Sequence, residues 1–125
     1  MLFDTDVLIW VFRGNAKAAR LIDQDAGRSL SVISYMELLH GAANRNEARL
    51  IKDFIKECTI ANLHLTENIG HRAAIYMEEL GLSSGLRVAD ALIAATAAEN
   101  HLPLCTGDYR HFRSIRELEI SVFRP

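Results

Sequence analysis

Residues 1–10 read MLFDTDVLIW, and two aspartates, Asp4 and Asp6, stand in the middle of this otherwise apolar run. A short apolar stretch that is followed at once by an acid is typical of a buried strand leading into a helix. Burying an unpaired carboxylate is costly, so an acid at such a place needs a partner. The decapeptide therefore predicts a strand, then a helix, with a charge at their junction that some other group must neutralise.

The rest of the chain alternates short apolar segments with longer helical ones. The apolar pattern predicts strands over residues 1–3, 30–33, 58–65, 103–106 and 118–123. It predicts helices over residues 5–12, 15–25, 34–43, 44–57, 66–80 and 87–100, with Gly81 ending the fifth. Strands separated by helices imply right-handed crossovers and parallel pairing. We therefore expect an α/β fold and a single domain over residues 1–125. It would be a three-layer sandwich, with a central parallel sheet of about five strands and helices on both faces.

Composition limits the classes of function. The 125 residues are 50% hydrophobic and carry a formal net charge of -2, so no overall basic field attracts nucleic acid. A nucleic-acid partner would have to be held locally, by clustered arginines or by a metal. Cys58 and Cys105 lack metal-finger or CxxC spacing, which favours free thiols in a reducing compartment. No signal peptide or membrane span is recognisable, so we expect a soluble, cytoplasmic protein.

Four acids follow predicted strand ends or lie near predicted helix starts: Asp4, Glu37, Asp90 and Asp108. In parallel sheets the active site lies at the carboxyl ends of the strands. A cluster of carboxylates there repels itself unless a hard divalent cation neutralises it, and oxygen ligands suit Mg²⁺ or Mn²⁺. The chemistry natural to such a site is phosphodiester hydrolysis by a metal-activated water.

The acids near the first two strands also have purely structural interpretations. Asp4 or Asp6 would cap the first helix. Ser34 and Glu37 have the spacing of a capping box, in which Glu37 would only close back on the helix start. Each interpretation stays open for its own residue.

The two later acids have similar alternatives. Arg87 lies one turn before Asp90 and would neutralise it as an ion pair. Asp108 follows Gly107 and would serve as a turn residue. The metal-site hypothesis is preferred because the structural interpretations together require four independent coincidences at one end of one sheet.

The segments around the four acids resemble those of the PIN-domain ribonucleases. They are DTDVLI with Asp4, SYMELLHGA with Glu37, RVADALIAATA with Asp90 and TGDYRHF with Asp108, in matching order and spacing. More narrowly, they are similar to the VapC-type toxins of toxin–antitoxin pairs, over nearly the whole chain. The resemblance implies a PIN fold and a Mg²⁺- or Mn²⁺-dependent endoribonuclease that acts on RNA. It also implies a homodimer that is inhibited by a cognate antitoxin.

Carried over by position, the same four acids would form the metal-binding and catalytic quartet. The resemblance implies that Asp4 and Asp90 bind the metal most directly. Glu37 would bind it or orient the attacking water. Asp108 would complete the site, directly or through water.

The resemblance assigns further residues less direct roles. Thr106 would contact a metal-bound water or a phosphate through its hydroxyl. Asp6, where the family often has Ser or Asn, would extend the metal shell or cap the helix. His111 stands where many relatives carry an additional acid, just before Phe112. That departure leaves Asp108 as the only acid in this segment.

Basic residues near the site have two interpretations each. His111, beside Arg110, would touch a substrate phosphate or lie on the surface. The arginines would line an RNA groove or form an ordinary solvated face; they are Arg13, Arg87, Arg110, Arg113 and Arg116.

Two other functions have some support in the sequence. The spacing of Asp4 and Asp6 also resembles the start of haloacid-dehalogenase-type phosphatases, but those enzymes need a late lysine, and no lysine follows Lys56. The stronger alternative is a catalytically silent PIN-like binding module for RNA or protein. The complete acidic set argues against loss of catalysis.

Overall fold

The computed structural model describes residues 1–125 and contains one sheet of five parallel strands in the order β3-β2-β1-β4-β5. The strands are β1 (Leu2–Phe3), β2 (Ser29–Ser31), β3 (Ala61–Leu63), β4 (Leu104–Thr106) and β5 (Ile120–Val122). In the central register, Leu2 pairs with both Ser29 and Leu104. The shortest strand, β1, therefore lies in the middle of the sheet, and the predicted five-stranded parallel architecture is confirmed.

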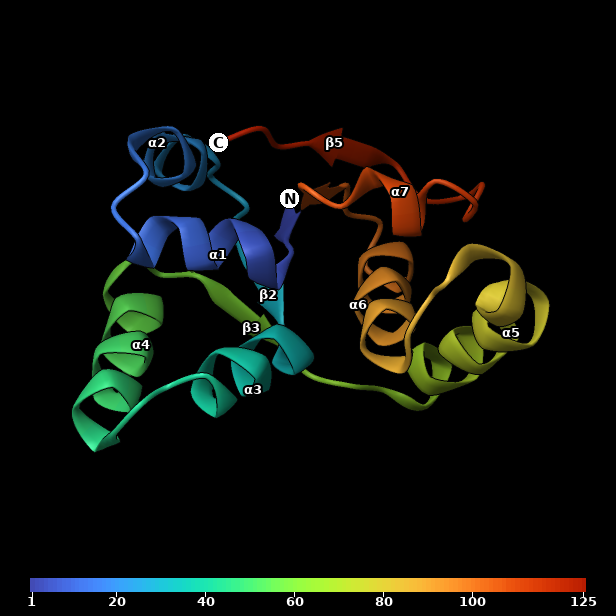
Figure 1. Ribbon diagram of the computed structural model, residues 1–125, viewed down its shortest axis with the longest axis horizontal. Coiled ribbons are helices and arrows are strands. Elements are labelled where there is room, and N and C mark those ends of the chain that lie inside the picture. The colour runs from blue at the N-terminus through green and yellow to red at the C-terminus, as the bar shows by residue number, and fades with distance from the viewer.

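Seven helices cover the sheet. They are α1 (Thr5–Phe12), α2 (Ala16–Gln24), α3 (Val32–His40), α4 (Arg45–Glu57), α5 (Glu67–Ser84), α6 (Val88–Glu99) and α7 (Tyr109–Phe112). Figure 1 shows α1, α2 and α4 on one side of the strands, and α5, α6 and α7 on the other. None of the seven combines the length and the apolar character that crossing a membrane requires.

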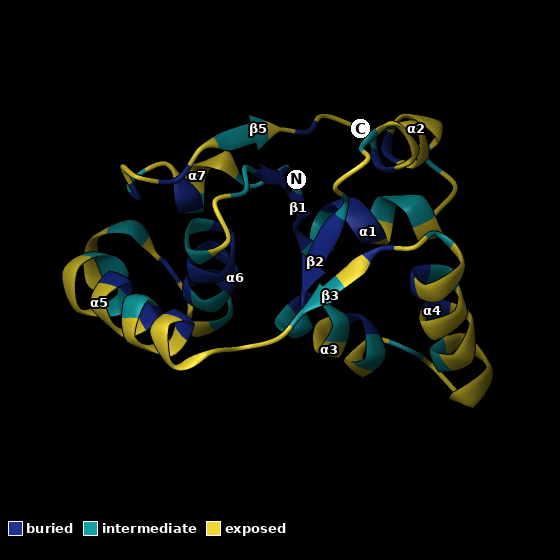
Figure 2. Cartoon of the chain, turned by 180° about the vertical axis from the view of Figure 1, so that it is seen from behind, coloured by how far each residue is buried: buried dark blue, intermediate teal, exposed yellow.

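The core is divided into two parts by the sheet because successive strand residues point to opposite faces. Leu2 and Leu104 pack with α5, α6 and α7, whereas Phe3 and Cys105 pack with α1, α2, α3 and α4. Figure 2 shows this buried interior in dark blue along β1, β2 and α6. Both cysteines are free thiols, as predicted, and burial raises the pKa of Cys105 to about 12.

The alanine-rich helix α6 is buried on most of its surface. Seven of its 12 residues are buried, four of them alanines, and their small side chains let α6 pack closely against α5. Because α6 is buried, an acid in its first turn is buried as well. Asp90 lies there and is only 7% exposed.

The start of α3 differs from the prediction. Strand β2 ends at Ser31, whose hydroxyl accepts the backbone N–H of Ile33 at 3.1 Å and caps the helix. The helix therefore begins at Val32, two residues before Ser34, so the capping-box interpretation of Ser34 and Glu37 is wrong. Glu37 instead lies in the second turn of α3.

Two further elements were mispredicted. Helix α5 continues past Gly81, where Met77 packs close to the glycine Cα, and ends at Gly85 with φ of 71°. A left-handed residue of this kind terminates a helix, and glycine adopts it without strain. The short helix α7, residues 109–112, was not predicted because four residues carry no recognisable apolar period.

Candidate active site

Asp4 joins the end of the central strand to its neighbour β4. It is 7% exposed and caps α1, with its Oδ1 accepting the backbone N–H of Thr5 at 2.8 Å. Its Oδ2 accepts the hydroxyl of Thr106 at 2.7 Å. The capping interpretation of Asp4 is therefore correct, but it accounts for only one of the two carboxylate oxygens.

Asp6 does not cap the helix; it contacts the loop after β4. Its Oδ2 accepts the backbone N–H of Gly107 at 2.9 Å, and its Oδ1 is buried without a hydrogen-bond partner. A side chain at position 107 would displace this carboxylate, because a Cβ there would lie 2.8 Å from that same Oδ2. An unpaired buried carboxylate oxygen is rare and points to a missing cation or water.

Thr106 and Asp108 extend the same network along β4. The fully buried Thr106 hydroxyl donates to Asp4 and accepts the backbone N–H of Asp108 at 2.9 Å. The Asp108 carboxylate, which is partly exposed, accepts Nδ1 of His111 at 2.6 Å. Two of the predicted motifs are thus linked by hydrogen bonds, through the Asp4 carboxylate, the Thr106 hydroxyl and the backbone N–H of Asp108.

Glu37 reaches the site from α3 through a threonine. The hydroxyl of Thr5 donates to Oε1 of Glu37 at 2.6 Å and lies 2.9 Å from the hydroxyl of the buried Ser34. Thr5 also directly follows Asp4 in the chain. This contact orients the Glu37 carboxylate toward the beginning of α1.

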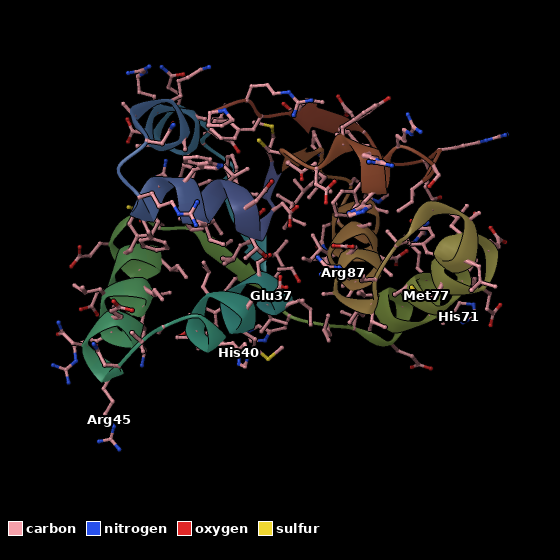
Figure 3. The ribbon with its side chains drawn as sticks, in the orientation of Figure 1. Glu37, His40, Arg45, His71, Met77 and Arg87 are labelled. Atoms are coloured by element: carbon pink, nitrogen blue, oxygen red, sulfur yellow. The ribbon has the colours of Figure 1, made fainter.

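Asp90 approaches from the other side of the sheet. Its Oδ2 accepts the backbone N–H of Arg87 at 3.2 Å and lies 3.7 Å from Nε of that arginine. The ion-pair interpretation is therefore correct, yet the Arg87 side chain is 77% exposed and shields the acid only weakly. Figure 3 shows Glu37 and Arg87 near the centre of the molecule, whereas His71 and Arg45 lie at its edges.

The acids raise one another's proton affinity. Burial, followed by the charge of Asp6, raises the pKa of Asp4 to about 7; Asp90 adds to this, while hydrogen bonds from Thr106 and Thr5 oppose it. Burial also raises the pKa of Asp6, against the Gly107 hydrogen bond, and the charge of Asp108 adds to the rise. Such mutual elevation is typical of a site that binds a cation.

The chemistry of the donor set fits a hard divalent ion. No group of three or more acidic, histidine or cysteine side chains is gathered closely enough to enclose a metal by itself. Magnesium usually keeps several waters and uses only one or two protein carboxylates, so an open arrangement suits it. The buried Oδ1 of Asp6 supplies an oxygen that otherwise has no partner.

A family model described as PIN domain matches residues 1–118 of the chain. The chain belongs to the PIN domain family. This PIN domain is 25% identical over 123 residues to Ribonuclease VapC1 of Methanocaldococcus jannaschii, covering 98% of this chain and 86% of that relative. The family resemblance predicted from the acidic motifs is thereby confirmed.

Solved structures show the same PIN architecture. A chain of the toxin–antitoxin complex from Klebsiella pneumoniae superposes with a TM-score of 0.82 at 25% identity, covering 99% of this chain and 98% of that one. A chain of VapBC-1 from nontypeable Haemophilus influenzae superposes with a TM-score of 0.82 at 22% identity, covering 97% and 96%. Both likenesses agree with the sheet order and the helical layers described above.

The arginines of this PIN domain do not form one continuous groove. Arg13 stacks over the ring of Trp10, with its Cζ 5.5 Å from the ring centroid. Arg110 and Arg113 line a hollow beside His111, whereas Arg116 lines a separate one. Of the two interpretations of these arginines, a solvated face and an RNA groove, the RNA groove stays a prediction.

Two contributors to the site were missed from the sequence. Thr5 holds Glu37, and Gly107 leaves the space that Asp6 occupies. Thr5 stands between Asp4 and Asp6, which was a signal for its proximity but not for its contact with α3. Nothing in the sequence pairs Gly107 with Asp6, because that contact depends on β1 lying beside β4.

Proposed function

We propose that this PIN domain is a metal-dependent endoribonuclease of the VapC type, the toxin of a toxin–antitoxin pair. The observation that carries the proposal is the hydrogen-bonded link from Asp4 through Thr106 to Asp108, at the carboxyl ends of two adjacent strands. Asp90 contributes to the same site, because its negative charge raises the pKa of Asp4. The similarity to a protein named as a ribonuclease supports RNA as the substrate.

In this proposal Asp4 and Asp90 hold Mg²⁺ or Mn²⁺, with Glu37 and Asp108 completing the site. When bound, the cation supplies a lowered pKa for the attacking water and neutralises charge on the phosphate. Thr106 keeps the Asp4 carboxylate in place through its hydroxyl. Thr5 holds Glu37, whose carboxylate would orient the water and accept its proton.

The antitoxin part of the proposal is supported by an apolar hollow between α1, α3 and α4, of about 490 Å³. Three of its lining residues are exposed apolar side chains, namely Ile9, Phe12 and Leu50. Exposed apolar surface of this kind marks a protein-binding site. Glu37 also lines the hollow, so an antitoxin segment bound there would cover a residue of the proposed site. The toxin–antitoxin complexes among the similar structures support this partner.

Cleavage of a mixed pool of structured RNAs tests the nuclease. Purified wild type is compared with Asp90→Asn in Mn²⁺ and in EDTA, and Asp23→Asn is the control because Asp23 is an exposed acid on α2. We expect metal-dependent cuts by the wild type and the control, and none by Asp90→Asn. If Asp90→Asn cleaves like the wild type, the shared carboxylate site is wrong. RNA binding without cleavage by any protein would favour the catalytically silent binding module.

The partner is tested separately with Leu50→Asp, which places a charge in the apolar hollow and leaves all four acids of the proposed site in the sequence. We expect this variant to cleave RNA normally and to resist inhibition by the cognate antitoxin. Inhibition equal to that of the wild type would show that the antitoxin binds elsewhere. The homodimer stays a prediction, and light scattering on the purified protein measures it.

A further inference from the structure

A basic hollow lies between the C-terminal end of α5 and α7, where Gly85 approaches His111. Its volume is about 620 Å³, and none of its seven lining residues is hydrophobic. They are Ser83, Ser84, Gly85, Arg110, His111, Arg113 and Ser114. Four other hollows on the surface each include apolar side chains, whereas the wholly polar lining of this one suits a charged or strongly polar ligand.

The charges of the basic hollow are not neutralised within the chain. Arg110 and Arg113 are both exposed, and neither forms an ion pair with any carboxylate. Their guanidinium groups therefore remain free to bind an anion. Arginine pairs with phosphate through two parallel hydrogen bonds, which makes a phosphate the natural ligand.

A hydroxyl in the same place lacks a partner. The Oγ of Ser114 is buried from solvent and forms no hydrogen bond. By contrast, the hydroxyl of Ser84 already donates to the carbonyl oxygen of Leu80 at 2.6 Å. Because the Ser114 oxygen is buried, the polar surface that the hollow offers to a ligand comes from Arg110, Arg113 and the remaining lining residues.

The basic hollow is connected to the proposed active site through one histidine. Nδ1 of His111 donates to the Asp108 carboxylate, 2.6 Å away. The opposite edge of the ring faces the hollow, since a Cβ built on Gly85 would lie 3.8 Å from both Cδ2 and Nε2. A single imidazole therefore separates a predicted metal-binding acid from the unpaired arginines.

We propose that the basic hollow binds a backbone phosphate of the RNA that flanks the bond being cut. This inference rests on the proposed ribonuclease function and adds a positioning site to it. Because the ring of His111 contacts Asp108 at one edge and faces the hollow at the other, the hollow lies next to the place where the scissile phosphate would bind. With a net charge of -2, the protein needs such a local basic site to retain RNA.

Binding of a fluorescein-labelled, mixed-sequence single-stranded RNA to the full chain in EDTA tests this inference. The variants are Arg110→Gln, Arg113→Gln and both together, with Arg20→Gln on α2 as the charge-matched control. We expect each single change to weaken binding about fivefold, because a charged hydrogen bond is lost. We expect the double variant to lower the slope of log affinity against log salt by about 0.7, the value for one phosphate contact on single-stranded nucleic acid. The Arg20 variant should bind like the wild type.

Steady-state cleavage in Mn²⁺ separates positioning from chemistry. The arginine variants should raise KM in step with their loss of affinity and change kcat by less than about twofold. In contrast, Asp90→Asn should abolish kcat. Lysine at both arginine positions should restore the salt slope, because the charge returns, while recovering only part of the affinity.

Three results would overturn the inference. If the arginine variants bind RNA like Arg20→Gln while the wild type cleaves, the basic hollow is not an RNA site although the ribonuclease proposal stands. If they bind RNA normally but lose affinity for the antitoxin, the hollow recognises an acidic protein segment. If the wild type neither binds nor cleaves RNA, both proposals fail together.

Discussion

The hydroxyl of Thr106 donates to Oδ2 of Asp4 at 2.7 Å, joining two residues that are 102 positions apart in the chain. This contact exists because β1 and β4 are adjacent parallel strands that end at the same edge of the sheet. Asp4 is only 7% exposed, and its partner here is a neutral hydroxyl, not a positively charged side chain. The charge of Asp4 is therefore held but not neutralised by the protein.

The first prediction concerns pH and the Asp4→Asn variant in EDTA. Because the pKa of Asp4 rises from 3.8 to about 7 on folding, its contribution to stability is full below about 3.8 and is lost as pH rises through about 7. The wild type should therefore lose up to about 4 kcal/mol relative to Asp4→Asn between pH 4 and pH 8. Thermal unfolding of both proteins across this range measures the difference, and parallel curves would contradict the prediction.

The second prediction concerns metal binding. Mn²⁺ at about 100 times its Kd should stabilise the wild type by about 2.7 kcal/mol, because it binds only the folded protein. Asp90→Asn should show little or none of this gain, since it lacks one of the two most direct ligands. Thermal shift titrations give both results. A rise in Tm with Asp90→Asn equal to that of the exposed control Asp23→Asn would place the metal elsewhere.

Much of the architecture was predictable because it depends on local patterns. The helix over residues 5–12 was predicted with the bounds that the structure shows, since an acid cap precedes a continuous apolar run. The end of α5 was not, because Gly81 and Gly85 look alike in sequence and only Gly85 has the left-handed backbone that stops a helix. A glycine indicates where a helix is able to end, and packing decides whether it does.

The candidate site was also predictable only in part. Asp4 and Asp108 follow β1 and β4 as the strand-end rule requires, and the structure links them through Thr106. The contacts of Thr5 with Glu37 and of Gly107 with Asp6 were not predictable. They depend on which strands are neighbours and on how α3 packs against α1, and neither is encoded in spacing along the chain.

The third prediction concerns Gly107→Ala. The added Cβ would lie 2.8 Å from Oδ2 of Asp6 and 3.4 Å from the carbonyl oxygen of Phe123, so either the Asp6 side chain or the loop after β4 must shift. We expect a loss of about 1–3 kcal/mol in the free energy of unfolding. Gly27→Ala is the matched control, because nothing lies within 4 Å of a Cβ there.

A double-mutant cycle assigns this cost to its cause. Asp6→Ala removes the oxygen that the new Cβ would contact, so Gly107→Ala should cost less in that background. Denaturant unfolding of the four proteins gives the coupling energy. An equal cost in both backgrounds would mean that the contact with Phe123, or the backbone itself, sets the penalty.

The fourth prediction concerns Thr5→Val, which removes one hydroxyl and keeps the side-chain shape. The Glu37 carboxylate would lose its 2.6 Å hydrogen bond and become free to rotate away from the site. We expect stability to fall by no more than about 1 kcal/mol and kcat for RNA cleavage to fall about tenfold. Thr5→Ser should cleave like the wild type, whereas equal rates for Thr5→Val and the wild type would remove Glu37 from the proposed mechanism.

The position of β1 in the middle of the sheet also determines when the proposed site can assemble during synthesis. A ribosome makes β1 first, but this strand of two residues acquires its second neighbour only when β4 emerges, about a hundred residues later. Until then the nascent chain contains Asp4 and Glu37 without Thr106 or Asp108. A chain that stops before Thr106 would therefore lack the hydroxyl that holds Asp4, so the order of the strands makes the proposed site depend on segments synthesised about a hundred residues apart.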